Sequence, residues 1–199
     1  MPVLISMLRG INVGGHNKIQ MDALRALYKS LKCESARTYI QSGNVIFFTK
    51  EKNSAVLAKK IQSAIERKFK CCPEVILRTP DELRKTIAAS PFADRPDLEP
   101  GKILVTFLAA EPPPEARTFL LTLKKFPEEV HLKGRELYIY FPSGAGNSKL
   151  PWSSIAKSLK TTGTARNWNS VNKMLQMAEE MEVEVSSGRE RNRRPLPKS

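Results

Sequence analysis

The sequence predicts an α+β protein made of two tandem ferredoxin-like halves, each with the order strand, helix, strand, strand, helix, strand, and an additional C-terminal helix. Short β-rich runs alternate with amphipathic segments, and this order occurs twice, although the residues themselves are not repeated. A proline-containing stretch without periodicity separates the two series. We therefore expect an N-terminal domain at residues 1–89, a linker at 90–101, a C-terminal domain at 102–184 and a disordered basic tail at 185–199.

The elements of the first half follow from its hydrophobic periodicity. An almost wholly apolar run is typical of a buried strand, and apolar residues three and four apart indicate amphipathic helices. The turn Ser42-Gly43-Asn44 joins two β-prone pieces, and Asn53 or Ser54 can cap the second helix. The predicted elements are strand 3–8, helix 20–32, strands 37–41 and 45–48, a helix carrying Leu57 to Phe69, and strand 74–77.

In the second half the same order follows a short helix, which Thr79 and Pro80 open and which runs to residue 89. Ser148 is the expected N-cap of the helix before the last strand, and Asn167 or Asn169 that of the final helix. The predicted elements are strand 103–108, a helix carrying Ala116 to Leu123, hairpin strands 130–132 and 137–141, a helix carrying Leu150 to Leu159, strand 161–165 and helix 168–181.

The chain is strongly basic, with 33 lysines and arginines against 20 acidic residues and a net charge of +13. Residues 186–199 carry five of the cations and one acidic residue, so most of the excess lies on the body. Phosphate contacts with nucleic acid would explain such an excess. A well-solvated basic surface explains it equally well, and charge alone does not separate the two explanations.

Several functional classes find no support in the sequence. The apolar N-terminal run lacks a basic leader and indicates a first strand, and no run reaches the roughly 20 apolar residues that cross a bilayer. Cys33, Cys71 and Cys72 have no framework spacing, which favours reduced thiols and a cytoplasmic protein. His16 and His131 stand in no metal or triad pattern. We therefore expect no membrane partner, metal or cofactor, and the catalytic residues, if any, stay unknown.

One glycine-rich loop, Leu8-Arg9-Gly10-Ile11-Asn12-Val13-Gly14-Gly15-His16-Asn17-Lys18, follows the first predicted strand. Glycines allow a loop to direct several N–H groups at one point, and the following helix adds the positive end of its dipole. This pattern predicts an anion cradle made of Arg9, Asn12, Gly14, Gly15 and Lys18. The alternative is a crossover loop whose glycines only permit a tight path.

Three further stretches extend this prediction. Strand alternation would place Tyr39 and Gln41 on one face, where they and Asn44 could contact a base or sugar; the alternative is a polar turn with Asn44 left-handed. Ser148 and Lys149 end a second glycine-rich loop, which lacks the signature of a nucleoside-triphosphatase loop. Arg166 could complete an anion pocket and Trp168 could line it. The alternative is a capped helix that this tryptophan anchors in the core.

Four motifs together resemble one bacterial family, the domain of unknown function 1697. They are Leu8-Arg9-Gly10-Ile11-Asn12-Val13-Gly14-Gly15, Arg37-Thr38-Tyr39-Ile40-Gln41-Ser42-Gly43-Asn44-Val45, Gly144-Ala145-Gly146-Asn147-Ser148-Lys149-Leu150 and Thr164-Ala165-Arg166-Asn167-Trp168-Asn169-Ser170-Val171. The resemblance runs from residue 1 to about 181 and leaves out the basic tail. It implies a compact cytoplasmic α+β protein and no established activity.

The charge and the loops favour non-catalytic binding of a phosphate-bearing ligand, either nucleic acid or a nucleotide. One alternative is an enzyme that acts on a small anionic metabolite and uses the same residues as its binding shell. Another is a protein-interaction module in which the polar motifs serve only folding. The sequence leaves the ligand, any reaction and the oligomeric state open.

Overall fold

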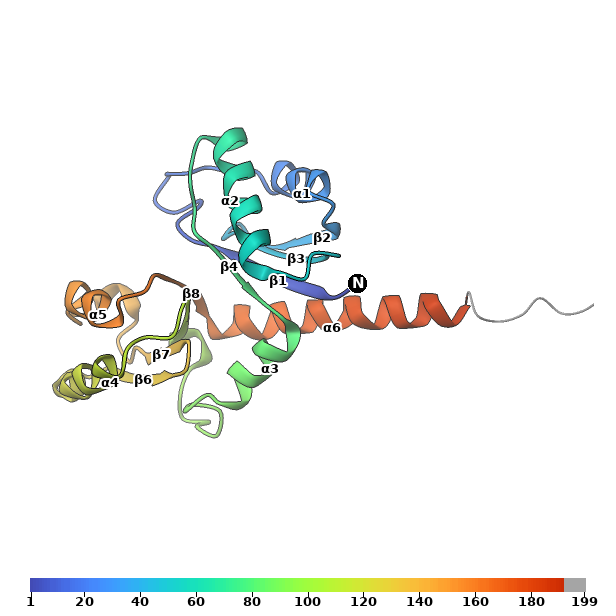
Figure 1. Cartoon of the computed structure of the whole chain (residues 1–199). Coiled ribbons are helices and arrows are strands. Elements are labelled where there is room, and N and C mark those ends of the chain that lie inside the picture. The colour runs from blue at the N-terminus through green and yellow to red at the C-terminus, as the bar shows by residue number, and fades with distance from the viewer. Residues whose placement is uncertain (192–199) are drawn as a thin grey trace, which may run out of the picture.

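The computed structural model describes residues 1–191, with side chains up to Glu184, and within this range it confirms the α+β class (Figure 1). Two four-stranded antiparallel sheets are accompanied by six α-helices in the described residues. The first half contains β1 (Val3–Leu8), α1 (Met21–Ser30), β2 (Glu34–Tyr39), β3 (Asn44–Phe48), α2 (Ser54–Phe69) and β4 (Val75–Arg78), and is followed by α3 (Pro80–Ala88). The second contains η1 (Pro100–Lys102), β5 (Ile103–Leu108), α4 (Pro114–Leu121), η2 (Thr122–Lys125), β6 (Glu129–Lys133), β7 (Glu136–Tyr140), η3 (Ala145–Asn147), α5 (Trp152–Leu159), β8 (Gly163–Asn167) and α6 (Trp168–Arg191).

The two sheets have the same strand order, β2-β3-β1-β4 in the first half and β6-β7-β5-β8 in the second. Their registers also correspond. Ile5 in β1 pairs with Ile46 and Arg78, and Val105 in β5 pairs with Tyr138 and Arg166. In each half, the end of the first strand therefore lies between the starts of the third and fourth strands.

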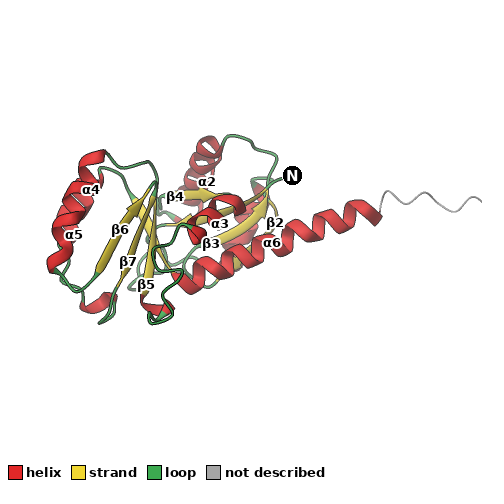
Figure 2. Cartoon of the chain, turned by 90° about the horizontal axis from the view of Figure 1, so that it is seen from below, coloured by secondary structure: helices red, strands yellow, loops and turns green. Residues whose placement is uncertain are grey.

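Each sheet buries one face under its own two helices. Side chains alternate across a strand, so Leu4 and Leu8 of β1 belong to the cluster under α1 and α2. In the second half, Leu108 of β5 and Ile139 of β7 belong to the cluster under α4 and α5. The view in Figure 2 shows α4 and α5 on one side of the second sheet.

The opposite faces of the two sheets share a single core. Val3, Ile5 and Met7 of β1 belong to the same buried cluster as Ile103, Val105 and Phe107 of β5. The long helix α6, orange to red in Figure 1, runs from the second half along the first sheet and closes this cluster with apolar side chains. Its buried residues there are Val171, Met174, Ala178 and Met181.

The segment between the two halves packs into this shared core. Phe92 and Leu98, both within the stretch expected to be a linker, are buried in the shared cluster. A segment with buried aromatic and aliphatic side chains is held in place more firmly than a solvated linker. The division into domains at residues 1–89 and 102–184 stays a prediction.

Several local expectations are confirmed. Asn53 caps α2 by accepting from the N–H groups of Ala55 and Val56, at 3.0 and 3.1 Å. Thr79 and Glu82 form a reciprocal capping box at α3, with Pro80 as its first residue. The Asn167 side chain accepts from the N–H of Asn169 at 2.9 Å, at the start of α6.

Other boundaries differ from the sequence prediction. Ser148 is not the N-cap of α5, because this helix begins at Trp152 after Pro151, and a proline disfavours helical geometry in the residue before it. Strand β2 ends at Tyr39, because Ile40 takes a positive φ of 49°. Helix α6 continues past residue 181 to Arg191, so residues 185–191 of the expected tail are helical. The remainder of that tail, 192–199, lies outside the described residues.

Candidate functional site

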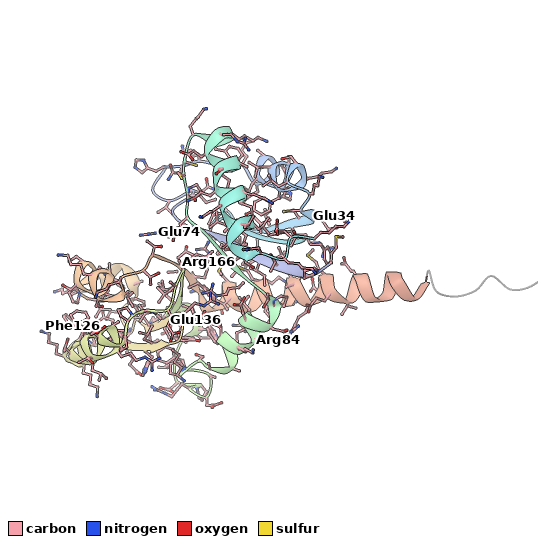
Figure 3. All side chains as sticks on the ribbon, viewed as in Figure 1. Glu34, Glu74, Arg84, Phe126, Glu136 and Arg166 are labelled. Atoms are coloured by element: carbon pink, nitrogen blue, oxygen red, sulfur yellow. The ribbon has the colours of Figure 1, made fainter. Side chains whose placement is uncertain are left out.

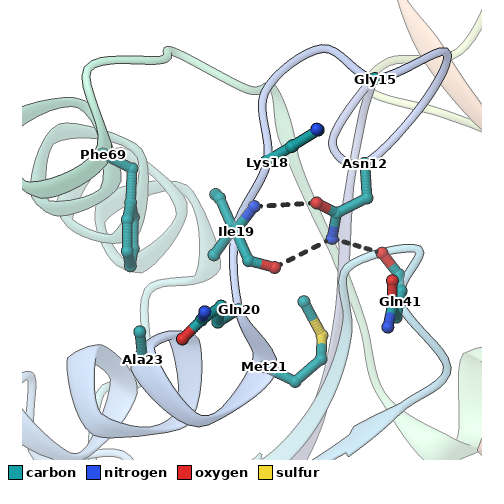
Figure 4. Close-up of a pocket in the computed structure, with 9 residues that line it drawn as sticks. All are labelled: Asn12, Gly15, Lys18, Ile19, Gln20, Met21, Ala23, Gln41 and Phe69. Atoms are coloured by element: carbon teal, nitrogen blue, oxygen red, sulfur yellow. Dashed lines mark hydrogen bonds between the residues drawn. The ribbon is translucent and has the colours of Figure 1, made fainter.

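The asparagines of the first glycine-rich loop hold its shape. The amide nitrogen of Asn12 donates to the carbonyls of Ile19 and Gln41, at 3.0 and 2.7 Å, and its Oδ1 accepts from the N–H of Ile19 at 2.8 Å (Figure 4). Asn17 donates to the carbonyl of Gly10 at 2.9 Å. Both asparagines have φ near +50°, a conformation that asparagine tolerates better than most residues. The Asn12 amide therefore links the loop to the hairpin turn, and its hydrogen-bonding groups are used within the protein.

A hollow of about 620 Å³ opens beside this loop. It lies between the loop, the start of α1, the end of α2 and the turn between β2 and β3 (Figure 4). Its polar lining comes from the loop, the helix start and the turn, and its apolar lining from α1 and α2. The lining residues are Asn12, Gly15, Lys18, Ile19, Gln20, Met21, Ala23, Gln41 and Phe69.

The electrostatic character of this hollow is positive. Gln20 is the N-cap residue of α1, and its side chain makes no capping hydrogen bond, so the N–H groups of the first turn lack a side-chain acceptor. Lys18 is exposed and forms no ion pair or hydrogen bond with the described residues. No carboxylate is among the lining residues, and the nearby Asp22 forms an ion pair with Arg25. These features suit an anion.

Arg9 and Gly14 lie in the same loop but outside the hollow lining. A guanidinium nitrogen of Arg9 forms an ion pair with Glu74 at 3.7 Å, and the Arg9 N–H donates to the carbonyl of Glu74 at 2.9 Å. Gly14 is exposed with a φ of 56°. Of the residues predicted to form the cradle, Asn12, Gly15 and Lys18 line the hollow, whereas Arg9 is paired with Glu74 and Gly14 lies outside the lining.

Arg166 and Asn44 meet, but inside the protein. Arg166 in β8 is only 7% exposed, and its Nε donates to the Oδ1 of Asn44. Its Nη2 donates to the carbonyls of Leu8 and Ser42, at 2.8 and 3.0 Å, and its Nη1 donates within β8. Burial lowers the pKa of the guanidinium to about 10, which keeps it charged at neutral pH. The Arg166 side chain therefore connects the two halves, and its donors are used in these internal hydrogen bonds.

The remaining predicted residues lie apart from the hollow. Tyr39 and Trp168 pack against the shared core. The positive φ of Ile40 breaks the strand alternation, so Tyr39 and Gln41 do not share a face as expected. Asn44 is not left-handed either: it is the first residue of β3, and Gly43 has the positive φ, 75°. The loop with Ser148 and Lys149 follows β7, at the end of the sheet where β5 begins, whereas the hollow lies beyond the end of β1.

Sequence reasoning missed Gln20 and Phe69 as lining residues, and it missed a buried ion pair. The periodicity places Phe69 on the apolar face of α2, and it does pack against the cluster under α1 and α2, but as the last residue of the helix it also reaches the hollow. The sequence prediction does not include Arg78, although a charged residue at the end of the apolar β4 run is a readable signal. It is 2% exposed, and its Nε and Nη2 lie 3.2 Å from Glu136 of the second half. Burial lowers the pKa of Arg78 and raises that of Glu136.

Comparison with known proteins places this chain in a family. Residues 1–138 match the family model described as protein of unknown function DUF1697. The chain belongs to this family. A similar solved structure is that of the conserved bacterial protein SP0830 from Streptococcus pneumoniae, with a TM-score of 0.62 and 23% identity over 89% of this chain and 98% of that one. This likeness shows a common fold for this DUF1697 member. The comparison with curated proteins finds no match.

The described part of this DUF1697 protein holds neither a membrane-spanning helix nor a metal-binding cluster. None of its helices combines the length and the apolar character needed to span a bilayer. Within the same residues, His, Cys, Asp and Glu side chains form no group of three or more that could hold a metal ion.

Proposed function

We propose that this DUF1697 protein binds a phosphate-bearing ligand, a nucleotide rather than a nucleic acid, in the hollow beside the first glycine-rich loop, and that it does so without catalysis. The observation that supports the proposal most directly is the unpaired Lys18 next to the uncapped start of α1, in a hollow without carboxylates. A phosphate would accept from the first-turn N–H groups and from the ammonium group.

The rest of the lining suits the remainder of a nucleotide. Phe69 and Met21 offer apolar surface for a base, and the amides of Gln20 and Gln41 offer donors and acceptors for a base or sugar. A mononucleotide is favoured over an extended strand, because Tyr39, predicted to contact a base, and Trp168, predicted to line the anion pocket, both pack against the shared core.

The two alternative functions are an enzyme and a protein-interaction module. An enzyme acting on an anionic metabolite needs an acid or base, and among the described residues the hollow lining offers neither histidine nor carboxylate. A protein-interaction role is favoured by one observation: Val13 and Ile40, on the neighbouring loop and turn, are 63% and 52% exposed. Exposed aliphatic side chains on adjacent loop tips are suited to docking a partner.

We also infer that each half adopts a ferredoxin-like fold. It rests on the shared order of strands and helices and on the shared sheet orders, with the first strand in the interior of each sheet. The glycine-rich loop then occupies the connection from the first strand to the first helix.

Thermal unfolding tests the nucleotide proposal. The full chain is scanned with mononucleotides, pyrophosphate, sugar phosphates and short RNA and DNA oligomers, in low and high salt. A ligand at 100 times its dissociation constant adds about 2.7 kcal/mol of stability and raises the midpoint. Lys18→Ala weakens this effect, and the matched control Lys29→Ala, at the other end of α1, leaves it unchanged.

Each outcome of the scan decides a part of the proposal. Stabilisation by oligomers alone, declining with salt, would replace the nucleotide by a nucleic-acid surface. A complete lack of stabilisation, or an unchanged response in Lys18→Ala, contradicts phosphate binding at this hollow. In that case the exposed pair Val13 and Ile40 becomes the place to test for a protein partner.

A further inference from the structure

Glu128 is a buried carboxylate without a partner. It lies between η2 and β6 and is 7% exposed, and its Oε2 is buried without a hydrogen bond. No ion pair or hydrogen bond joins its side chain to any described residue. The adjacent Glu129, by contrast, lies 3.6 Å from Arg95. Burying a carboxylate without a compensating donor is unfavourable, so this group is ready to accept a hydrogen bond from a cation.

This carboxylate lines a second hollow. Its volume is about 440 Å³, and it lies where α4 and η2 meet the edge strand β6. Its apolar walls come from Leu120 and Leu123 of the helices and Phe126 of the following turn. Figure 3 shows Phe126 at the end of the second half, well away from Arg166 and from Glu34 in the first half. The second hollow is therefore independent of the one beside the glycine-rich loop.

We propose that this hollow binds a primary ammonium or guanidinium group carried on an apolar stem. The cation donates to Glu128, and the aliphatic stem packs on the leucines and Phe126, as the stems of lysine and arginine pack on apolar surfaces. Lys124, Glu129 and His131 line the same hollow. The cation comes from a free amine or from a basic side chain of a peptide.

The features of the hollow determine the choice of probes. n-Butylamine and n-butylguanidine carry a cation on a short stem, and n-butanol has a similar stem without the charge. The peptide acetyl-Ala-Ala-Lys-Ala-Ala-amide tests the second source, with norleucine in place of lysine as its control. Binding to the full chain is followed by NMR, through the methyl signals of Leu120 and Leu123.

The proposal predicts saturable shifts of these methyl signals with the cations and weaker or no shifts with the neutral controls. Glu128→Gln keeps the shape of the side chain and lowers the affinity for the cations at least about tenfold, because a neutral amide replaces the charged acceptor. Glu111→Gln, an exposed position before α4, leaves the affinity unchanged. Binding of the peptide alone assigns the cation to a side chain, and binding of butylamine assigns it to a free amine.

Three results overturn the proposal. They are an absence of shifts with every cation, equal affinity for each cation that binds and its neutral control, and an unchanged affinity in Glu128→Gln. If Glu128→Gln does not fold, the comparison of each cation with its neutral control, butanol or the norleucine peptide, on the unmodified chain still decides the outcome. A site in the first hollow can fail its own test without affecting this one, because no lining residue is common to both.

Discussion

Arg78 and Arg166 occupy equivalent positions in the two halves, and each reaches across to the end of the other half's first strand. Arg78 pairs with Ile5 in the sheet and donates its Nη2 to the carbonyl of Leu108 at 2.8 Å. Arg166 pairs with Val105 and donates its Nη2 to the carbonyl of Leu8, also at 2.8 Å. The shared core is therefore closed at this edge by two reciprocal arginine links.

The two links differ in the residue that faces each arginine. Glu136 pairs with Phe107 and forms an ion pair with Arg78, whereas Asn44 pairs with Met7 and is a neutral acceptor for the hydrogen bond from Arg166. The Arg78 link is a buried ion pair. Arg166 has only neutral acceptors, so its charge is stabilised by carbonyl and amide dipoles.

Substitution of either arginine is expected to loosen the contact between the halves. Arg166→Met leaves the carbonyls of Leu8 and Ser42 without their donors, and we expect a loss of about 3 kcal/mol. Arg78→Met leaves Glu136 buried without its cation, and we expect a loss of about 3–5 kcal/mol. Urea denaturation measures both.

The partner and a surface arginine supply the controls for this prediction. Glu136→Leu added to Arg78→Met restores part of the stability, because the unpaired buried charge is gone. Arg95→Met, at an exposed ion pair with Asp97, costs at most about 1 kcal/mol. Losses for Arg78→Met and Arg166→Met no larger than that would show that the links are not needed for stability.

The turn between β2 and β3 combines a strained residue with a required glycine. Ile40 is β-branched, half exposed and has a φ of 49°, so Ile40→Asn should raise the stability by about 1 kcal/mol. Gly43 is the opposite case. Its φ is 75°, and an added Cβ would lie 2.6 Å from the Cδ1 of Ile11, so Gly43→Ala should cost about 2 kcal/mol or more. A destabilised Ile40→Asn in thermal unfolding would contradict the assignment of strain.

The strands and helices were largely predictable because they rest on local periodicity. Helix α2 and its Asn53 cap, the capping box of α3, and β5 follow from residues within a few positions of each other. The shared core was not predictable in the same way. Phe92 lies in a stretch without periodicity, and its burial depends on two sheets and α6 that are far away in sequence.

The candidate site was predictable only in part, for the same reason. The glycines and asparagines of the first loop indicate an irregular path, and Lys18, Asn12 and Gly15 do line a hollow. The role of Arg166 was not readable, because its acceptors come from β1, β3 and the turn before β3. A sequence motif marks a residue as unusual, but whether that residue faces solvent or another half depends on long-range packing.

His131 gives the stability a specific pH dependence. His131 is exposed on β6, and partial desolvation lowers the pKa of its ring below the ordinary value of 6.5, next to the ring of Phe92 at 5.5 Å. The unfolded chain therefore takes up this proton first as the pH falls, so the contribution to stability is present above pH 6.5 and is lost as the pH falls through the folded pKa.

The variant His131→Gln isolates this contribution. The difference in unfolding free energy between the unmodified chain and His131→Gln should shrink between pH 7.5 and pH 5, because only the unmodified chain loses stability through this group. His16→Gln, on the exposed loop, is the matched control. A difference that stays constant over this interval would show that His131 is protonated equally easily in both states.

The three cysteines should react with a thiol reagent in a fixed order. Cys72 is exposed, Cys71 is half-buried, and Cys33 is 1% exposed under α1 and α2 with a pKa raised to about 11 by burial. Thiolates are the reacting species, so at pH 8 we expect Cys72 to react first and Cys71 next. Cys33 should react only at the rate of unfolding. Cys72→Ser should remove the fastest phase, and Cys33→Ser should leave the native phases unchanged. Rapid labelling of Cys33 without denaturant would show that the cluster under these helices opens in the native state.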